Sequence, residues 1–332
     1  MIIRTFLKSE VYNLIFLLLT IVLLRFPEFF KPEHLTYYTL NDTFREHFFY
    51  SISSLLPQKL DITLSSIILI IQALFLGYVF KKHVLINKLA YMPEFLFIVI
   101  GCSLTSFAYL SPPLICNFLF IIGLDILFSC SKSDKQLRKL FYLGLLGSLG
   151  SVLYLPYIFM IPAFIFSLYV IKSVRIKEII SILMGSSVPY IFLLTIYIWF
   201  DKAFLFSKIW LDIDFDIPQK YNADNNDFYA ALTILAPILI ISLSQLSIVS
   251  KKRSYMNAKN LFSTLIVFVV AILSGFIFLD FNNTSSLILL TGPASILMSI
   301  FFINKDNYYW IKEVVVLYII TCILFIKVSY LF

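Results

Sequence analysis

The chain of 332 residues is 60% hydrophobic and only 14% charged, which excludes a soluble enzyme and predicts an integral membrane protein. Its net charge of +7 comes from basic loops between apolar segments, so we do not expect nucleic-acid binding. No polar stretch is long enough for a separate soluble domain, and we expect residues 1–332 to form one all-α transmembrane domain. The 4 cysteines show no metal-ligand spacing, so neither a metal nor another cofactor is expected.

Apolar segments recur along the whole chain at lengths that suit helices crossing a bilayer. The first follows a short basic N-terminus but lacks a small-residue cleavage site, so we interpret it as a retained span rather than a signal peptide. Windowed hydropathy predicts about eleven spans, with boundaries uncertain by ~2–4 residues. They cover residues 11–27, 61–80, 89–109, 112–130, 140–155, 157–171, 179–199, 229–249, 260–279, 285–303 and 313–331.

The basic residues predict the orientation of these spans. With the N-terminus in the cytoplasm, most of the 26 Lys and Arg residues lie in cytoplasmic loops, as the positive-inside rule requires. The C-terminus then lies on the exoplasmic side, together with most of the 19 carboxylates. The abundance of Phe, Ile, Lys and Tyr is typical of an AT-rich bacterial genome, so we expect a multi-pass protein of the bacterial inner membrane, with the lipid bilayer as its first partner.

The central apolar run extends from Lys139 to Lys172 and has a basic cluster at each end. At ~20 residues per crossing it is too long for one upright helix, and Pro156 in its middle argues against one tilted helix. Two cytoplasmic ends require an even number of passes. We therefore predict a hairpin of two short helices over 140–171, with its tip at Leu155, Pro156 and Tyr157, and we expect a groove to form beside it.

Three glycines, Gly144, Gly147 and Gly150, recur at every third position in the first arm of this hairpin. Such a stripe lets a second helix approach closely. A ligand-binding role is the alternative, but no basic residue stands close by to hold a phosphate, so the pattern favours helix packing.

Two carboxylates, Glu94 and Asp125, fall inside predicted spans, each about five residues from the cytoplasmic end. Intramembrane acids cost several kcal/mol unless they are paired or hydrated. A proton- or cation-coupling pair is one interpretation. The other, which we favour, is that both side chains reach Lys88, Lys132 or interfacial water.

The first exoplasmic loop and the residues before it hold the most varied chemical groups in the chain. The acids Glu28, Asp42 and Glu46 are candidate catalytic residues, since a carboxylate can deprotonate an acceptor. The cations Arg25, Arg45 and His47 are candidate substrate-binding residues, since Arg holds a phosphate with two parallel hydrogen bonds. The alternative is an ordinary surface loop with charge neighbours at i and i+4.

This organisation resembles that of the polytopic glycosyltransferases of the GT-C type, which use polyprenyl-phosphate-linked sugars. The resemblance rests on Glu28 in the loop after the first span and on the segment 110–193, with its Ser-Pro-Pro start, Gly-rich short helix, Leu-Pro turn and Gly185/Pro189 span. It implies about ten to thirteen spans and an exoplasmic active site that takes a sugar from a lipid-linked donor. The chain also looks like uncharacterised multi-pass inner-membrane proteins common in Bacteroidota, a resemblance that implies no function.

The sequence leaves three functional classes open. The first is sugar transfer from a polyprenyl-phosphate-linked donor in cell-envelope assembly. The second is a non-enzymatic membrane scaffold or subunit of an envelope assembly or secretion complex, which the short loops favour. The third is a transporter or flippase. The donor sugar, the acceptor, the protein partners and the oligomeric state are not predicted.

Overall fold

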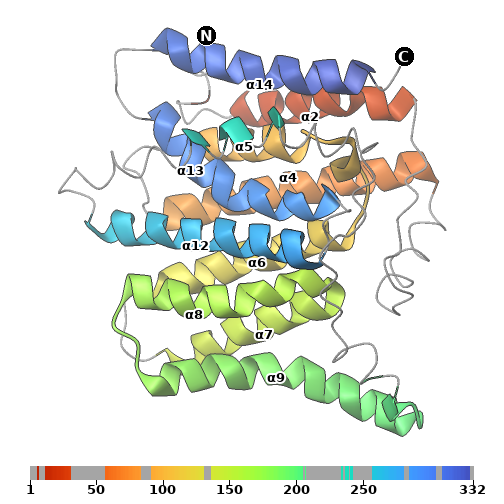
Figure 1. The fold of residues 1–332 in the computed structure, drawn as a ribbon. Helices are drawn as coiled ribbons and strands as arrows, with labels where there is room; N and C mark the ends of the chain where they lie inside the picture. The colour runs from red at the N-terminus through yellow and green to blue at the C-terminus, as the bar shows by residue number, and fades with distance from the viewer. Residues whose placement is uncertain are drawn as a thin grey trace.

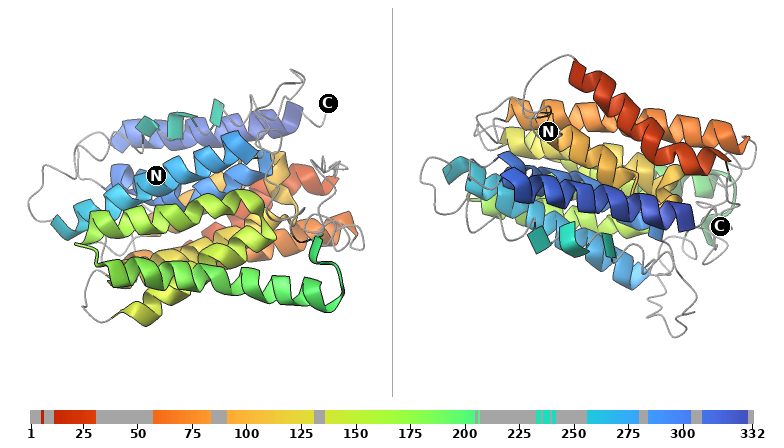
Figure 2. Two further views of the ribbon diagram at one scale, coloured as in Figure 1. Left: turned by 60° about the horizontal axis from the view of Figure 1, so that its bottom comes forward. Right: turned by 90° about the horizontal axis from the view of Figure 1, so that it is seen from above.

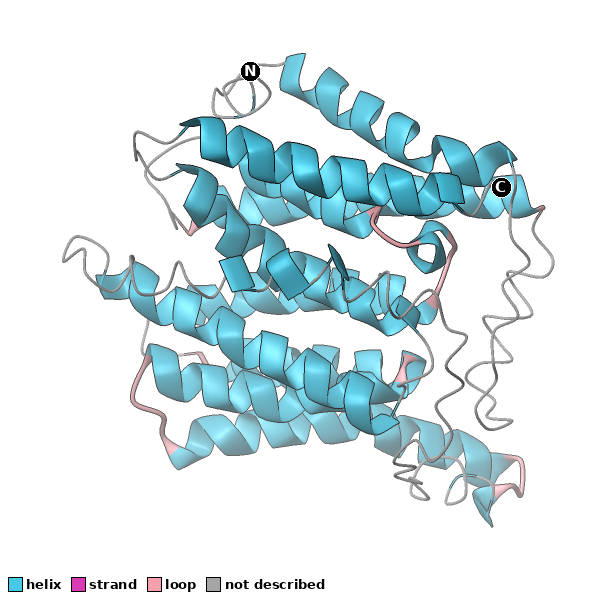
Figure 3. Ribbon diagram, turned by 45° about the horizontal axis from the view of Figure 1, so that its top comes forward, coloured by secondary structure: helices cyan, strands magenta, loops and turns pink. Residues whose placement is uncertain are grey.

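The computed structural model describes residues 6, 12–30, 57–83, 91–130, 136–204, 206, 233–234, 236–238, 240–241, 256–279, 284–303 and 309–329. Within these ranges the chain is helical, with short loops and no strand (Figure 3). The all-α prediction is therefore confirmed for this part of the protein.

The α-helices match the apolar segments in order. They are α2 (Tyr12–Phe30), α4 (Gln58–Lys82), α5 (Met92–Gly101), α6 (Pro112–Ser129), α7 (Leu137–Leu153), α8 (Met160–Ile171), α9 (Ile176–Trp199), α12 (Met256–Leu279), α13 (Thr291–Ile303) and α14 (Tyr309–Ser329). Three 3-10 helices join them: η1 (Thr105–Ala108), η3 (Leu155–Phe159) and η5 (Thr284–Leu290). Of the segment 229–249, only residues 233–234, 236–238 and 240–241 are described, and they are helical.

Four of these helices are long and apolar enough to cross a bilayer, namely α2, α4, α6 and α9, and further apolar helices are shorter. The shortest is α5, whose ten residues span about 15 Å at 1.5 Å per residue, half of a ~30 Å hydrocarbon core. The apolar helices indicate a membrane-embedded protein.

The helices lie side by side in a stack (Figure 1). At one edge α2 packs beside α14, and at the opposite edge α9 packs against α7. Between them lie α5 with α13, α4 with α6, and α8 with α12. Two further views show the same side-by-side arrangement (Figure 2).

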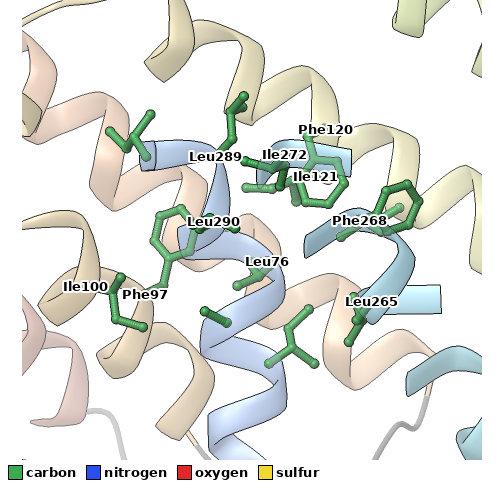
Figure 4. Packing of buried hydrophobic residues seen from close by; sticks show 14 of the residues in the cluster. Leu76, Phe97, Ile100, Phe120, Ile121, Leu265, Phe268, Ile272, Leu289 and Leu290 are labelled. Carbon is green, nitrogen blue, oxygen red and sulfur yellow. The ribbon is translucent and has the colours of Figure 1, made fainter. Parts of the chain in front are cut away.

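The apolar core runs through the middle of this stack. Phe268 of α12 contacts Phe120 of α6 and Phe164 of α8 edge-on, with ring centroids 5.1 and 5.4 Å apart. Leu76 and Phe97 fill the space toward α4 and α5 (Figure 4). The outer faces of α2 and α9 keep large apolar side chains exposed, as contact with lipid requires.

The predicted span over 89–109 is not one continuous helix. Its α-helical part, α5, ends at Gly101, and η1 then leads to Tyr109. The run Ser103, Thr105 and Ser106 explains this break, because hydroxyl side chains compete for backbone hydrogen bonds. The predicted 285–303 span has the mirrored order, since η5 precedes α13. The two 3-10 helices contact each other, and Thr284 Oγ1 donates to Ser106 Oγ at 3.1 Å.

The chain reverses direction between α7 and α8 at Tyr154 and η3, which agrees with the predicted hairpin and tip. The glycine stripe packs against other helices, as its spacing favoured. A Cβ atom at Gly144 would lie 2.0 Å from the Ile182 carbonyl oxygen of α9, and one at Gly147 would meet the Ile161 side chain of α8 at 3.0 Å.

Candidate functional site

A buried arginine lies near the end of α2, where α4 begins. Arg25 is 1% exposed although it carries a permanent charge. Its Nη1 donates to the hydroxyls of Ser65 and Ser66 on α4, at 2.6 and 2.8 Å. Its Nη2 donates to the Phe107 carbonyl oxygen of η1, at 2.9 Å. One guanidinium therefore joins three segments that are distant in sequence.

The η1 turn explains why an arginine is needed there. A short 3-10 helix leaves backbone carbonyls without helical partners, and such groups are costly inside an apolar environment. Arg25 donates to two of them, Phe107 O and Ala108 O. Asp61 of α4 accepts from the Leu110 backbone N–H at 3.3 Å and lies close enough to Arg25 for electrostatic attraction. The pair thus supports the backbone between α5 and α6.

A second buried charge pair lies one turn further along α2. The Glu28 carboxylate is 2.5 Å from Lys327 Nζ of α14, and both side chains are buried. Lys327 also donates to the Leu24 carbonyl oxygen at 2.7 Å. Leu24 lies in the turn before Pro27, where the proline ring disturbs the helix's own hydrogen bonds. This ion pair therefore joins α2 to α14, the first and the last long helix that the structure describes.

We refer to Arg25, Glu28, Asp61 and Lys327 as the buried charge cluster. Near it, three hydroxyls of the segment between α5 and α6 are buried and have no hydrogen-bond partner among the described residues: Ser103, Thr105 and Ser111. The Nε atom of Arg25 has no such partner either. This end of the bundle therefore holds charges of both signs together with unused hydrogen-bonding groups.

The structure places two of the six sequence-predicted site residues, Arg25 and Glu28, and brings them to the same buried end of α2. The other four, Asp42, Arg45, Glu46 and His47, lie outside the described residues. They belong to residues 31–56, which follow α2 directly and precede α4. The chain therefore leaves and re-enters the described structure next to the buried charge cluster.

The two intramembrane acids, Glu94 and Asp125, form ion pairs at the opposite end of α4. Glu94 of α5 accepts from Lys81 Nζ at 2.9 Å. Asp125 of α6 contacts Lys82 Nζ at 2.7 Å and His83 Nε2 at 2.8 Å. Both acids are ion-paired, as the favoured interpretation expected, but with Lys81 and Lys82 of α4 rather than with Lys88 or Lys132, which lie outside the described residues. His83, which follows α4, adds a contact to Asp125.

An amide network lies between the two ends of α4. Asn117 Nδ2 of α6 donates to Gln72 Oε1 of α4 at 3.2 Å and to Thr291 Oγ1 of α13 at 3.0 Å. Gln72 Nε2 donates to the Leu114 carbonyl oxygen at 2.7 Å. These bonds satisfy polar groups in the apolar core and fix how α4, α6 and α13 pack.

Sequence reasoning missed three parts of this arrangement. Lys327 was not recognised as the partner of Glu28, because some 300 residues separate them. Asp61 and the serine pair Ser65-Ser66 carried only a weak signal, namely polar residues at the start of an apolar segment.

Within the described part of the chain, no three His, Cys, Asp or Glu side chains gather as metal ligands.

The fold and the polar ends define an all-helical, membrane-embedded protein with charged residues buried near one end. Residues 44–332 match the model of a family of unknown function, DUF6427, and the chain belongs to that family. No curated protein and no solved structure matches the chain.

Proposed function

We propose that the protein transfers a sugar from a polyprenyl-phosphate-linked donor at the end of the bundle that holds the buried charge cluster. The observation that carries the proposal is the burial of Arg25, Glu28, Asp61 and Lys327 where α2 ends and α4 begins, the two helices between which residues 31–56 stand in the sequence. Replacing a buried ion pair by well-packed apolar residues is often neutral or stabilising. Charged residues held inside an apolar bundle are therefore better explained by a role in binding or catalysis than by a contribution to the stability of the fold.

The geometry favours a division of labour among the candidate residues. Glu28 is engaged by Lys327, and most donors of Arg25 are engaged by serines and backbone carbonyls. In the proposed mechanism these two residues fix the end of α2 and the chain that leaves it. Asp42 or Glu46 then serves as the base, and Arg45, with His47, holds the donor phosphate.

The chemical step needs one base and one phosphate site. The acceptor hydroxyl oxygen attacks the anomeric carbon of the donor sugar while the carboxylate of Asp42 or Glu46 takes the hydroxyl proton. The bond between the anomeric carbon and the phosphate oxygen breaks, and polyprenyl phosphate leaves. An arginine that donates two hydrogen bonds to the phosphate stabilises the charge on this leaving group. The proposed site is in the exoplasmic half of a bacterial inner-membrane protein with about eleven spans, as the basic loops predict.

The test is donor turnover by the purified protein in lipid nanodiscs. The substrates are a panel of polyprenyl-phosphate monosaccharides, and mass spectrometry measures released polyprenyl phosphate. Asp42→Asn or Glu46→Gln should lower the rate by ~10²–10⁴, the usual effect of losing a positioned base. Asp224→Asn, in another predicted exoplasmic loop, is the matched control and should leave the rate unchanged. Absence of turnover with the whole panel, or full activity of the Asp42→Asn/Glu46→Gln double variant, would contradict the proposal.

A membrane scaffold is the second candidate, and the surface of α9 favours it. Only 17% of the apolar stretch of this helix is buried by the described residues, so within the described structure α9 presents a long apolar face that another membrane protein could cover. Leucine-to-tryptophan substitutions on that face, such as Leu183→Trp, should then disturb assembly of a complex and leave the buried charge cluster intact. The enzyme proposal expects these substitutions to leave donor turnover unchanged.

A further inference from the structure

The helices α7 and α9 pack side by side, and α9 begins about one turn beyond the start of α7, because Leu137, the first residue of α7, lies beside Ser181. They run in the same direction, because Leu137 lies beside Ser181 while Ser151 lies beside Tyr190. The Ser181 hydroxyl donates to the Leu137 carbonyl oxygen at 2.7 Å. Further along, a Cβ atom at Gly185 would lie 2.1 Å from the Phe141 carbonyl oxygen. This close packing fixes the position of one helix start relative to the other.

Four exposed basic side chains surround these helix starts: Arg138, Lys139, Arg175 and Lys177. Glu178, the acid next to Arg175 and Lys177, is buried and already paired, since it contacts Lys172 Nζ at 2.7 Å and the Arg175 backbone N–H at 3.2 Å. Asp134, four residues before Arg138, lies outside the described residues. Among the described residues, none of the four exposed cations forms an ion pair. Within the described part of the chain these four positive charges are not neutralised, although Lys139 Nζ donates a hydrogen bond to the Ser129 hydroxyl at 3.2 Å.

The position of these cations is electrostatically unusual for helices. The N-terminus of a helix carries a partial positive charge and normally attracts acidic side chains into its first turn. Here Arg138 and Lys139 occupy the first turn of α7, and Arg175 and Lys177 flank the first residue of α9. At α7 the helix dipole and the side chains add charge of the same sign, which favours an anion there, whereas Glu178 already occupies the first turn of α9.

Apolar side chains border the same site. Ile176, between Arg175 and Lys177, is 76% exposed, and Leu137 and Ile180 are each 48% exposed. Such residues are unfavourable in water but suit the boundary between lipid chains and head groups. A ligand that complements this surface has an anionic head for the cations and a hydrocarbon chain for the isoleucines.

We propose that Arg138, Lys139, Arg175 and Lys177 bind the phosphate head of an anionic phospholipid whose acyl chain lies along the exposed face of α9. Arginine donates two parallel hydrogen bonds to phosphate oxygens, and the lysines add charge. The site goes beyond the proposed sugar transfer, because it involves none of the residues assigned to that activity. It also lies on a helix at the edge of the molecule, where lipid has access (Figure 1).

The experiment measures binding of short-chain phosphatidylglycerol to the purified full-length protein in detergent, with phosphatidylcholine as the neutral comparison. Wild type should bind phosphatidylglycerol more tightly, and the preference should weaken with added salt. Arg138→Gln, Lys139→Gln, Arg175→Gln and Lys177→Gln, combined, should remove the preference, at about fivefold in affinity for each charge. The double variant Arg175→Gln/Lys177→Gln gives the same readout, at about 25-fold, if the quadruple variant does not fold.

The matched control neutralises another group of four basic residues, Lys251, Lys252, Arg253 and Lys259, and should keep the wild-type preference. Equal losses in the control and in the site variant would show general charge attraction and overturn the proposal. Equal affinity of the wild type for both lipids would also overturn it. So would an equally large response to inorganic phosphate, which would identify a free anion as the ligand.

Discussion

The two ends of α4 carry charged groups in different surroundings. Near its start, Asp61 is buried beside Arg25, which is 1% exposed. In its last turn, the side chains of Lys81 and Lys82 are 26% and 40% exposed. The two groups are twenty residues apart, about 30 Å along a helix, which matches the hydrocarbon thickness of a bilayer. Lysines at such a boundary reach water through their flexible stems and neutralise nearby carboxylates at modest cost. The buried arginine has no comparable route to solvent.

The difference separates charges that fit ordinary membrane topology from charges that need another explanation. At the end of α4 the ion pairs join basic residues to acids of α5 and α6, and they give Glu94 and Asp125 the partners that acids inside a membrane need. At the start of α4 the charges also support irregular backbone at η1 and join α2 to α14. The proposed sugar transfer belongs to the start of α4, and the following substitutions test the contrast between the two ends.

The largest effect is expected when one member of the Glu28 and Lys327 pair is removed. Glu28→Gln or Lys327→Met leaves an uncompensated buried charge, which typically costs about 3–5 kcal/mol. The thermal midpoint in detergent and the yield of monodisperse protein measure the loss. A midpoint within error of wild type for both single variants would show that this pair is hydrated and would remove the contrast between the ends.

Arg25→Lys is expected to rank second. An ammonium group cannot reproduce the planar fork that reaches Ser65, Ser66 and the η1 carbonyls. Buried acceptors left without donors cost roughly 1–3 kcal/mol. Hydrogen exchange measured by mass spectrometry should show faster exchange in peptides covering 102–111, with little change at α9. Unchanged exchange at 102–111 would rule out the supporting role of Arg25.

Gly77→Ala tests the other end of α4 through its packing. A Cβ atom there would lie 1.9 Å from Glu94 Oε1, so the alanine must displace the carboxylate from Lys81. We expect destabilisation on the order of 1–3 kcal/mol, as for overpacked core positions. Combining Gly77→Ala with Glu94→Ala should cost less than the sum of the single changes, because the clash disappears. If the two losses in stability added exactly, the predicted clash between residue 77 and Glu94 would be contradicted.

The smallest effect is expected for Lys82→Gln. This partly exposed ion pair with Asp125 should contribute below about 1 kcal/mol, and less at high salt. Thermal midpoints at low and high salt provide the measurement. If Lys82→Gln lowered the thermal midpoint as much as Lys327→Met does, the ion pairs at the two ends of α4 would not differ in their contribution to stability.

Much of the fold could be predicted because its causes are local. Apolar runs located the helices, and Pro156 between two basic clusters predicted the α7 and α8 hairpin. The spacing of Gly144 and its neighbours predicted a close helix contact, and Gly144 does lie against the backbone of α9. The site was predicted only in part. Arg25 and Glu28 could be singled out by their position after the first apolar run.

The remaining features depend on contacts between distant parts of the chain. Nothing local to Glu28 specifies Lys327, and the acceptors of Arg25 at η1 are backbone carbonyls, which have no sequence signature. The end of α5 at Gly101 depends on competition between helix continuation and the hydroxyl side chains that follow. The partners of Glu94 and Asp125 depend on how three helix ends meet. Each of these outcomes requires the tertiary packing.

The central claim is that the buried charge cluster is retained for activity rather than for stability. The most direct test is the double variant Glu28→Met/Lys327→Met, assayed for thermal midpoint and for release of polyprenyl phosphate in the same preparation. We predict a midpoint equal to or above that of wild type, since apolar replacement of a buried pair is often neutral or stabilising. We also predict that donor turnover is lost, because the end of α2 no longer positions residues 31–56. A stable double variant that retains wild-type turnover would contradict the account.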